Sequence, residues 1–252
     1  MAKSQAMDGR QSFAWILDVA TEDTTASTST SLEAGKIVIV TGMADSDSGF
    51  GTNKSMINKP VLVSKPLTLK TGDKYRLCTP IFLGMAKDKS LNKTKNTQEI
   101  TVDCDEATNN VTDGLIAISG SISCSFSVDG EGYASNYIKK RFGNIVKIDS
   151  TGKPTLTEAI TTEKDLVLFA WNARNASAND IIEFDVVPCL FTGINHSASY
   201  GSSQSFDIDF TGNATDENGY EAATVQMDAG LSFVQLLVTN RAGMDQAAQA
   251  SA

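Results

Sequence analysis

Histidine is nearly absent from this chain, since His196 is the only one among 252 residues. A Ser-His-Asp catalytic site would have to use that side chain, and no G-x-S-x-G motif accompanies it. Zinc sites need several Cys and His ligands at short spacing. The four cysteines are widely spaced and form no C-x-x-C pair. We therefore expect no enzyme, no metal and no cofactor, and four reduced, structural cysteines.

Positive charge is also in short supply. The chain has 21 Lys and Arg against 30 Asp and Glu, a formal net charge of −9. Affinity for nucleic acid needs Lys and Arg that displace counterions from phosphates, so ordinary DNA binding is excluded. An acidic surface suits a wall past which nucleic acid slides, and it equally suits plain solubility. Aromatic residues, at 7%, are too few for a carbohydrate-stacking surface.

Long hydrophobic runs are missing as well. No stretch of about 18 apolar residues occurs, so the sequence predicts no transmembrane helix. In the opening MAKSQAMDGRQ, no apolar segment follows the basic residue, and we expect no secretory signal and no membrane insertion.

What is present is a pattern of short strands. The clearest covers residues 116–128, where apolar residues alternate with Ser119, Ser121, Ser123 and Ser125. This period of two predicts a strand with one face on the core and the other polar. We expect a bulge or bend at Gly120. A similar half-buried strand carries Phe206, Ile208 and Phe210 on one face and Asp207 and Asp209 on the other.

Other elements follow from composition and spacing. Residues 166–171 and 181–194 are apolar enough for buried strands, and 222–227 and 231–239 are further strand candidates. Residues 131–142 predict a single helix, with Asp129 as cap and a buried stripe from Ala134 to Phe142.

The chain divides into three parts by pattern. Residues 1–77 are expected to form an N-terminal arm, to about residue 35, and a small β elaboration. Residues 78–240 form the main β domain, and 241–252 a C-terminal tail. Pro60 and Pro66 predict that the strand between them is an edge or is broken.

Two hydrophilic stretches of the main domain are expected to be surface loops, either solvated or in contact with neighbouring subunits. One is basic and the other is acidic and Asn-rich. Their candidate contact residues are Lys87, Lys89, Lys93 and Lys95 in the first, and Asp105, Glu106, Asn109 and Asn110 in the second. The segment ADSDSGFG at 44–51 faintly resembles a calcium loop, but its acidic residues are out of place, and a solvated turn is the better interpretation.

The order of elements from 78 to 212 resembles the tail tube proteins of long-tailed bacteriophages. The resemblance is carried by Thr79-Pro-Ile-Phe-Leu, a hairpin arm with Gly114-Leu-Ile-Ala-Ile-Ser-Gly-Ser, the helix at 131–142, and a closing strand pair at 190–199 and 204–212. Similar proteins carry a G-L-x-x-x-S-x-S sequence leading to the helix. Residues 1–77 have no counterpart in the smallest members.

The resemblance implies a mainly β fold, a β-sandwich or half-barrel with one flanking helix. Six copies would form a ring, and rings would stack into a tube that conducts DNA into the host. The partners would be further copies, other tail proteins and passing DNA that is not specifically bound. The chain would be part of the virion, assembled in the host cytoplasm. Serines 119–125, Asp207 and Asp209 are candidates to face the lumen.

Three other interpretations compete with this one. The chain could be another virion component, such as a decoration or baseplate protein, which would differ in forming no tubes. It could be a surface β-sandwich that binds sugar or protein, which predicts an exposed aromatic cluster. An enzyme on a β scaffold is the third, and the single histidine argues against it.

Overall fold

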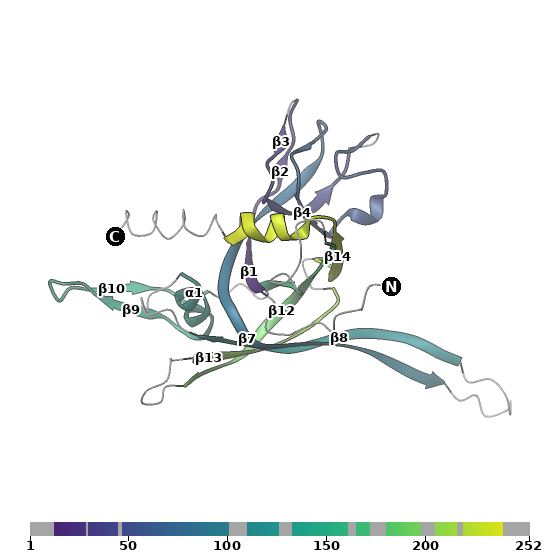
Figure 1. The fold of residues 1–252 in the computed structure, drawn as a ribbon. Coiled ribbons are helices and arrows are strands. Elements are labelled where there is room, and N and C mark those ends of the chain that lie inside the picture. The colour runs from purple at the N-terminus through teal and green to yellow at the C-terminus, as the bar shows by residue number, and fades with distance from the viewer. Residues whose placement is uncertain are drawn as a thin grey trace.

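The structure is a computed structural model. It describes residues 13–28, 30–44, 47–100, 110–125, 133–160, 165–171, 180–197, 205–215 and 219–238. These residues form a mainly β protein in which a curled antiparallel sheet carries a flanking helix, α1 (Figure 1). The predicted fold class, a β-sandwich or half-barrel with one flanking helix, is therefore confirmed.

The elements have the following bounds. The strands are β1 (Phe13–Val19), β2 (Thr24–Thr25), β3 (Ser31–Leu32), β4 (Ile37–Gly42), β5 (Pro60–Leu62), β6 (Leu67–Thr68), β7 (Lys74–Ile100), β8 (Asn110–Ser125), β9 (Ile145–Ile148), β10 (Pro154–Thr157), β11 (Asp165–Ala170), β12 (Ile182–Ser197), β13 (Ser205–Asn213) and β14 (Ala223–Met227). The helix α1 covers Tyr133–Phe142, a 3-10 turn covers Lys54–Met56, and residues 230–238 are also helical.

The main sheet has the order β1-β11-β12-β13-β8-β7-β4-β5, with β14 added beside β12 and β2 beside β7. Strand β7 also pairs with β1, from Phe13 opposite Met85 to Val19 opposite Cys78. The sheet therefore curls until its first strand meets its sixth, which encloses an apolar interior. Strand β5, which begins at Pro60, ends the order, as the predicted edge position requires.

Strands β1 and β11 are buried on both faces. Ala14 and Ile16 of β1 point into the curled sheet, where they join Val167 and Phe169. Trp15 of β1 points to the other side, into a second core. A continuous apolar run is what a strand covered on both sides requires, and both strands have one. The prediction that residues 1–35 form a peripheral arm is therefore wrong for 13–19.

The second core is covered by the helix at 230–238. Phe233, Val234 and Leu237 lie in this core, and the ring of Phe233 meets that of Phe184 edge-on at 5.6 Å. The expected strand at 231–239 is thus wrong. Spacings of one, three and four residues place these side chains on one helical face, and the apolar surface of β12 decides the outcome.

Strands β8 and β13 are buried on one face only. Ile118, Ile122, Phe206, Ile208 and Phe210 all lie in the interior core, as their alternation predicts. The pairing of β8 with its neighbours has no register shift at Gly120, so the bulge expected there is absent. A Cβ at Gly120 would instead lie 2.2 Å from the Ser90 carbonyl oxygen and 2.4 Å from the Phe210 ring. The glycine is required by close packing.

Helix α1 confirms the predicted element over 133–142, and residues 129–132 lie outside the described part of the chain. Tyr137 and Ile138 pack on the interior core, whereas Phe142 is 44% exposed. Arg141 forms an ion pair with Asp165 at the start of β11, and the Tyr137 hydroxyl donates to the same carboxylate at 2.7 Å. Burial raises the pKa of the Asp165 carboxyl, with Arg141 opposing it.

The N-terminal elaboration has a core of its own. Val38, Val40, Phe50 and Tyr75 belong to a separate cluster under β4 and the start of β7. Strand β7 begins at Lys74 and runs on to Ile100 without interruption. It therefore crosses the predicted division between residues 77 and 78 and joins the elaboration to the main sheet.

Candidate functional site

A broad polar surface covers one face of the sheet where β7, β8, β13 and β12 lie side by side. Pairing aligns Asp88, Ser123, Asp207 and Asn195 in one row across the four strands. The next row aligns Ser90, Ser121 and Asp209. We call this surface the polar face; its members are Asp88, Ser90, Asn92, Thr94, Ser119, Ser121, Ser123, Asn195, Asp207, Asp209 and Thr211, all exposed or half-buried.

The polar face is held in register by the strand ladders and by one hydroxyl pair. The Ser90 and Ser121 hydroxyls lie 3.1 Å apart, and the Ser121 amide donates to the Ser90 hydroxyl at 3.1 Å. Adjacent strands lie about 4.8 Å apart, and β8 lies between β7 and β13. The backbones at Asp88 and Asp207 are therefore separated by about 10 Å. The serines and aspartates predicted to share a surface are therefore brought together. Ser125 lies opposite Ser205, but its side chain is outside the described set.

The lysines of β7 lie on the opposite side of the same strands. Lys89 is paired with Ile122, Lys93 with Ile118 and Lys95 with Ile116, so each shares the apolar side of the sheet. The prediction of a lysine-rich loop is wrong, because residues 87–95 are part of β7. Their alternation with Asp88, Ser90, Asn92 and Thr94 has the period of a strand, which is the signal that a count of hydrophilic residues misses.

Two of these lysines bind within their own chain. The ammonium of Lys89 lies 5.5 Å from the centre of the Trp171 ring, a cation–π contact. Lys93 Nζ lies 2.5 Å from Asp185 Oδ1 and 3.1 Å from the Thr224 hydroxyl. Both contacts cross from β7 to other parts of the curled sheet, one to Trp171 directly after β11 and the other to Asp185 on β12.

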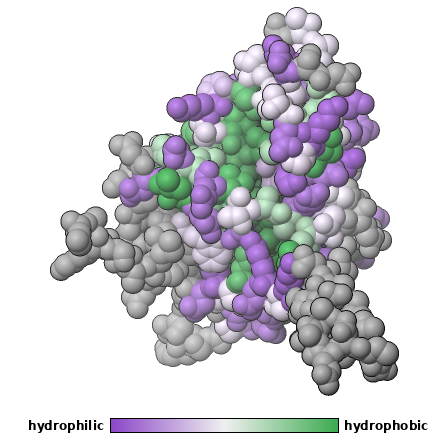
Figure 2. Space-filling model, turned by 90° about the vertical axis from the view of Figure 1, so that its right-hand side faces the viewer, coloured by the Kyte–Doolittle hydropathy of each residue, from purple (hydrophilic) through white to green (hydrophobic). Residues whose placement is uncertain are grey.

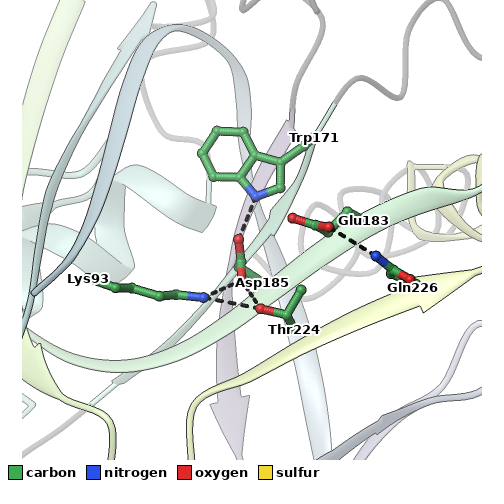
Figure 3. Close-up of polar contacts among 6 residues, drawn as sticks. All are labelled: Lys93, Trp171, Glu183, Asp185, Thr224 and Gln226. Atoms are coloured by element: carbon green, nitrogen blue, oxygen red, sulfur yellow. Dashed lines mark hydrogen bonds and ion pairs between the residues drawn. The ribbon is translucent and has the colours of Figure 1, made fainter. Parts of the chain in front are cut away.

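Asp185 is the centre of this network (Figure 3). Its carboxylate accepts from Thr224 Oγ1 at 2.6 Å and from the Trp171 indole at 2.7 Å, besides Lys93. Only 6% of the residue is exposed. Burial alone raises the pKa of Asp185, but the hydrogen bonds from Lys93, Thr224 and Trp171 outweigh it and hold the pKa below its ordinary value. The carboxylate is thus ionised and fully bonded.

Other predicted contact residues are placed only in part. Asp105, Glu106 and Asn109 lie outside the described residues. Asn110 begins β8, where it is paired with Ile100, and Lys87 is part of β7.

A carboxylate from elsewhere binds Ala44, Ser48 and Gly49 of the calcium-like segment. Asp73 accepts from the Ala44 amide and the Ser48 hydroxyl through one oxygen, and from the Gly49 and Lys70 amides through the other, at 2.6–2.9 Å. Burial raises the pKa of Asp73, and these four hydrogen bonds reverse the effect and lower it. Within the described ranges, no group of three His, Cys, Asp or Glu side chains could hold a metal ion.

The groups considered for chemistry stand apart from one another. His196 is at the exposed end of β12, opposite Phe206. Cys78 and Cys189 are buried free thiols, as expected for structural cysteines, and burial raises the pKa of Cys78 to about 12. None of the helices described here is long and apolar enough to span a membrane.

Comparison of the sequence with known proteins does not assign the chain to a family. A scan against protein-family models and a search of curated proteins both found no significant match to the chain.

Proposed function

We propose that this chain is a structural subunit of a bacteriophage tail tube. Copies would join into rings, hexameric if they follow the resemblance, and stacked rings would form the conduit for DNA ejection, with the polar face lining the lumen. The observation that carries the proposal is the division of charge across β7, β8, β13 and β12. Carboxylates and hydroxyls occupy the polar face, and the lysines of β7 occupy the other side.

This division suits a surface that DNA must pass without sticking. Each phosphate that a Lys or Arg neutralises releases counterions and strengthens binding, with a salt-dependence slope of about −0.9 per contact. The polar face, as defined by its described members, has no cation and has carboxylates at Asp88, Asp207 and Asp209. Its hydroxyls stay hydrated, so a duplex would meet a wet, weakly repelling wall.

The β7–β8 ribbon supports assembly. From Thr97 opposite Asp113 to Ile100 opposite Asn110, the two strands continue beyond the end of β13 and form a projecting arm (Figure 1). A two-stranded ribbon is marginally stable alone in water, so an arm of this kind gains from a neighbouring subunit. The Lys93–Asp185 ion pair fixes its base to β12. The arm would therefore bridge to the next ring, and other tail proteins would contact the tube ends in the virion.

The first test is negative-stain electron microscopy of the concentrated protein. Stacked rings or hollow tubes with a central channel are the expected result. Protein that remains a monomer, even with added tail-tip complex, would contradict the proposal.

A second test addresses the lumen. In phage particles, Asp207→Asn with Asp209→Asn should slow genome ejection, and Asp207→Lys with Asp209→Lys should stall it in a way that added salt relieves. Glu33→Lys with Glu158→Lys is the matched control, because it makes the same charge change at exposed sites away from the polar face. Normal genome ejection by the lysine variant would contradict the proposal that the polar face lines the lumen.

A further inference from the structure

The hairpin of β9 and β10 exposes an apolar face. Val146 is paired with Leu156, and Ile148 with Pro154, so all four side chains share one side of the hairpin. Val146 is 61% exposed, Ile148 67% and Leu156 61%. The hairpin projects from the body of the protein beside α1 (Figure 1). Single exposed apolar residues are ordinary, but a projecting face made of them indicates an interaction site.

The hairpin is nevertheless built to hold one shape. Asp149 Oδ1 accepts from the Thr151 amide at 2.8 Å, the Thr151 hydroxyl at 2.6 Å and the Lys153 amide at 2.9 Å. The Asp149 amide donates to the Lys153 carbonyl at 3.1 Å, and Gly152 supplies the positive φ of 83° that the turn needs. A pre-organised hairpin loses little conformational entropy when it docks.

Charge identifies the kind of surface that would receive it. The hairpin carries Lys147 and Lys153 against Asp149, and the last turn of the neighbouring helix α1 adds Lys139 and Lys140, so this region has four cations and one carboxylate in a chain whose net charge is −9. The rest of the chain is acidic, so the complement of this basic, apolar-faced region is an acidic surface of another copy. Oppositely charged surfaces steer association and fix its register.

One surface on the far side of the molecule sets an exposed apolar residue among carboxylates. Ile181, directly before β12, is 64% exposed. Asp180 precedes it and Glu183 follows on β12, both exposed, and exposed Asp228 lies next to the pair that Met227 of β14 forms with Ile182. Strand β14 lies on the opposite side of Figure 1 from the hairpin. Figure 2 views that side and shows apolar surface bordered by hydrophilic side chains.

We propose that the apolar face of the β9–β10 hairpin docks onto the Ile181 surface of a second copy of this chain. Because the two surfaces differ and lie on opposite sides, the contact is heterologous, and repetition generates a closed ring or an open chain of copies. Four apolar side chains cover less than the about 1,600 Å² of a standard interface. The hairpin is thus one element of a larger contact. This inference rests on the proposed self-assembly and assigns it a surface.

The test measures association of the full chain by sedimentation velocity over a concentration series. Ile148→Thr with Leu156→Thr should raise the concentration at half-assembly about tenfold or more, because apolar contact is lost while strand propensity is kept. Thr155→Ser with Thr157→Ser is the matched control on the other face of the hairpin and should assemble as the wild type does. Circular dichroism melting checks that all variants are folded.

A charge exchange tests the partner surface. Lys153→Glu and Glu183→Lys should each weaken association, and the chain carrying both substitutions should recover it. Failure of the double variant to recover would overturn the assignment to the Ile181 surface. Normal assembly of Ile148→Thr with Leu156→Thr would overturn the docking role of the hairpin and leave the tube proposal standing. A wild-type chain that stays monomeric even with added tail-tip complex, and instead sediments with phosphatidylcholine vesicles, would overturn both and assign the hairpin to a lipid surface.

Discussion

Strands β11 and β8 belong to the same sheet, yet they face different surroundings. All six residues of β11 are buried, and alternate side chains enter two different cores. In β8, Ile118 and Ile122 are buried while Ser119 is exposed. The difference lies in the side chains, because the backbone ladder is the same. A continuous apolar run forces cover on both faces, and strict alternation leaves one face free for water.

The largest expected effect sharpens this contrast at adjacent positions. Leu168→Ala and Phe169→Ala should each lower the free energy of unfolding by about 2–5 kcal/mol, because neighbours on β11 fill different cores. On β8, Ile118→Ala should cost a similar amount, whereas Ser119→Ala should stay within about 0.5 kcal/mol. Urea unfolding measures all four. Equal costs at positions 118 and 119 would contradict one-sided burial of β8.

A smaller effect is expected where the two regions are tied together. Asp185→Asn should lower the free energy of unfolding by about 2–3 kcal/mol, since it weakens the bonds to Lys93, Thr224 and Trp171. The pKa of Asp185 is lowered by folding, so its contribution is present above the unfolded value, about 3.9, and is lost as pH falls through the folded value.

The same variant therefore carries a pH signature. Wild-type stability should fall steeply below about pH 4, and Asp185→Asn should fall less steeply, with Asp73 still contributing. Urea midpoints measured from pH 7 to pH 3 provide the check. Parallel curves for the two proteins would show that the hydrogen bonds of Asp185 do not lower its pKa on folding. Glu183→Gln, on the same strand but exposed, is the control.

The smallest effect concerns the packing beneath the polar face. Gly120→Ala should cost about 1–3 kcal/mol, because its Cβ would meet the Phe210 ring and the Ser90 carbonyl. Phe210→Leu in the same chain should recover part of this loss by removing ring atoms. Gly143→Ala is a matched control, since its Cβ would meet nothing within 4 Å. A double variant no better than the sum of the two single ones would exclude the ring as the cause.

Local pattern predicted much of the fold and the serine–aspartate part of the polar face. Alternation located β8 and β13, and the apolar run located β11. Pattern failed for residues 231–238, because a short apolar run fits a strand or a helix equally and burial against β12 decides between them. It failed for β7 between 87 and 95 because Lys there replaces the expected apolar residue on the inner side.

The ion pairs could not be predicted from local sequence patterns. Lys93 and Asp185 are 92 residues apart, and Arg141 and Asp165 are 24 apart. No motif links such pairs, since the folded sheet alone brings them together. Asp73 likewise binds Ala44, Ser48 and Gly49 from a distant turn. The members of the polar face on β7 could have been found, because Asp88, Ser90, Asn92 and Thr94 alternate with Lys89, Leu91, Lys93 and Lys95.

Strand β7 is also a mechanical element. Its 27 residues have a contour length of about 90 Å at about 3.3 Å each, and the strand bends on its way from the N-terminal elaboration to the projecting ribbon (Figure 1). Along this length it is hydrogen-bonded in turn to β2, β4, β1 and β8. A pull on the ribbon along the strand axis would load these ladders in shear, so many hydrogen bonds would have to break together. Tension at one end of the molecule would thus be carried by a single continuous backbone to the other.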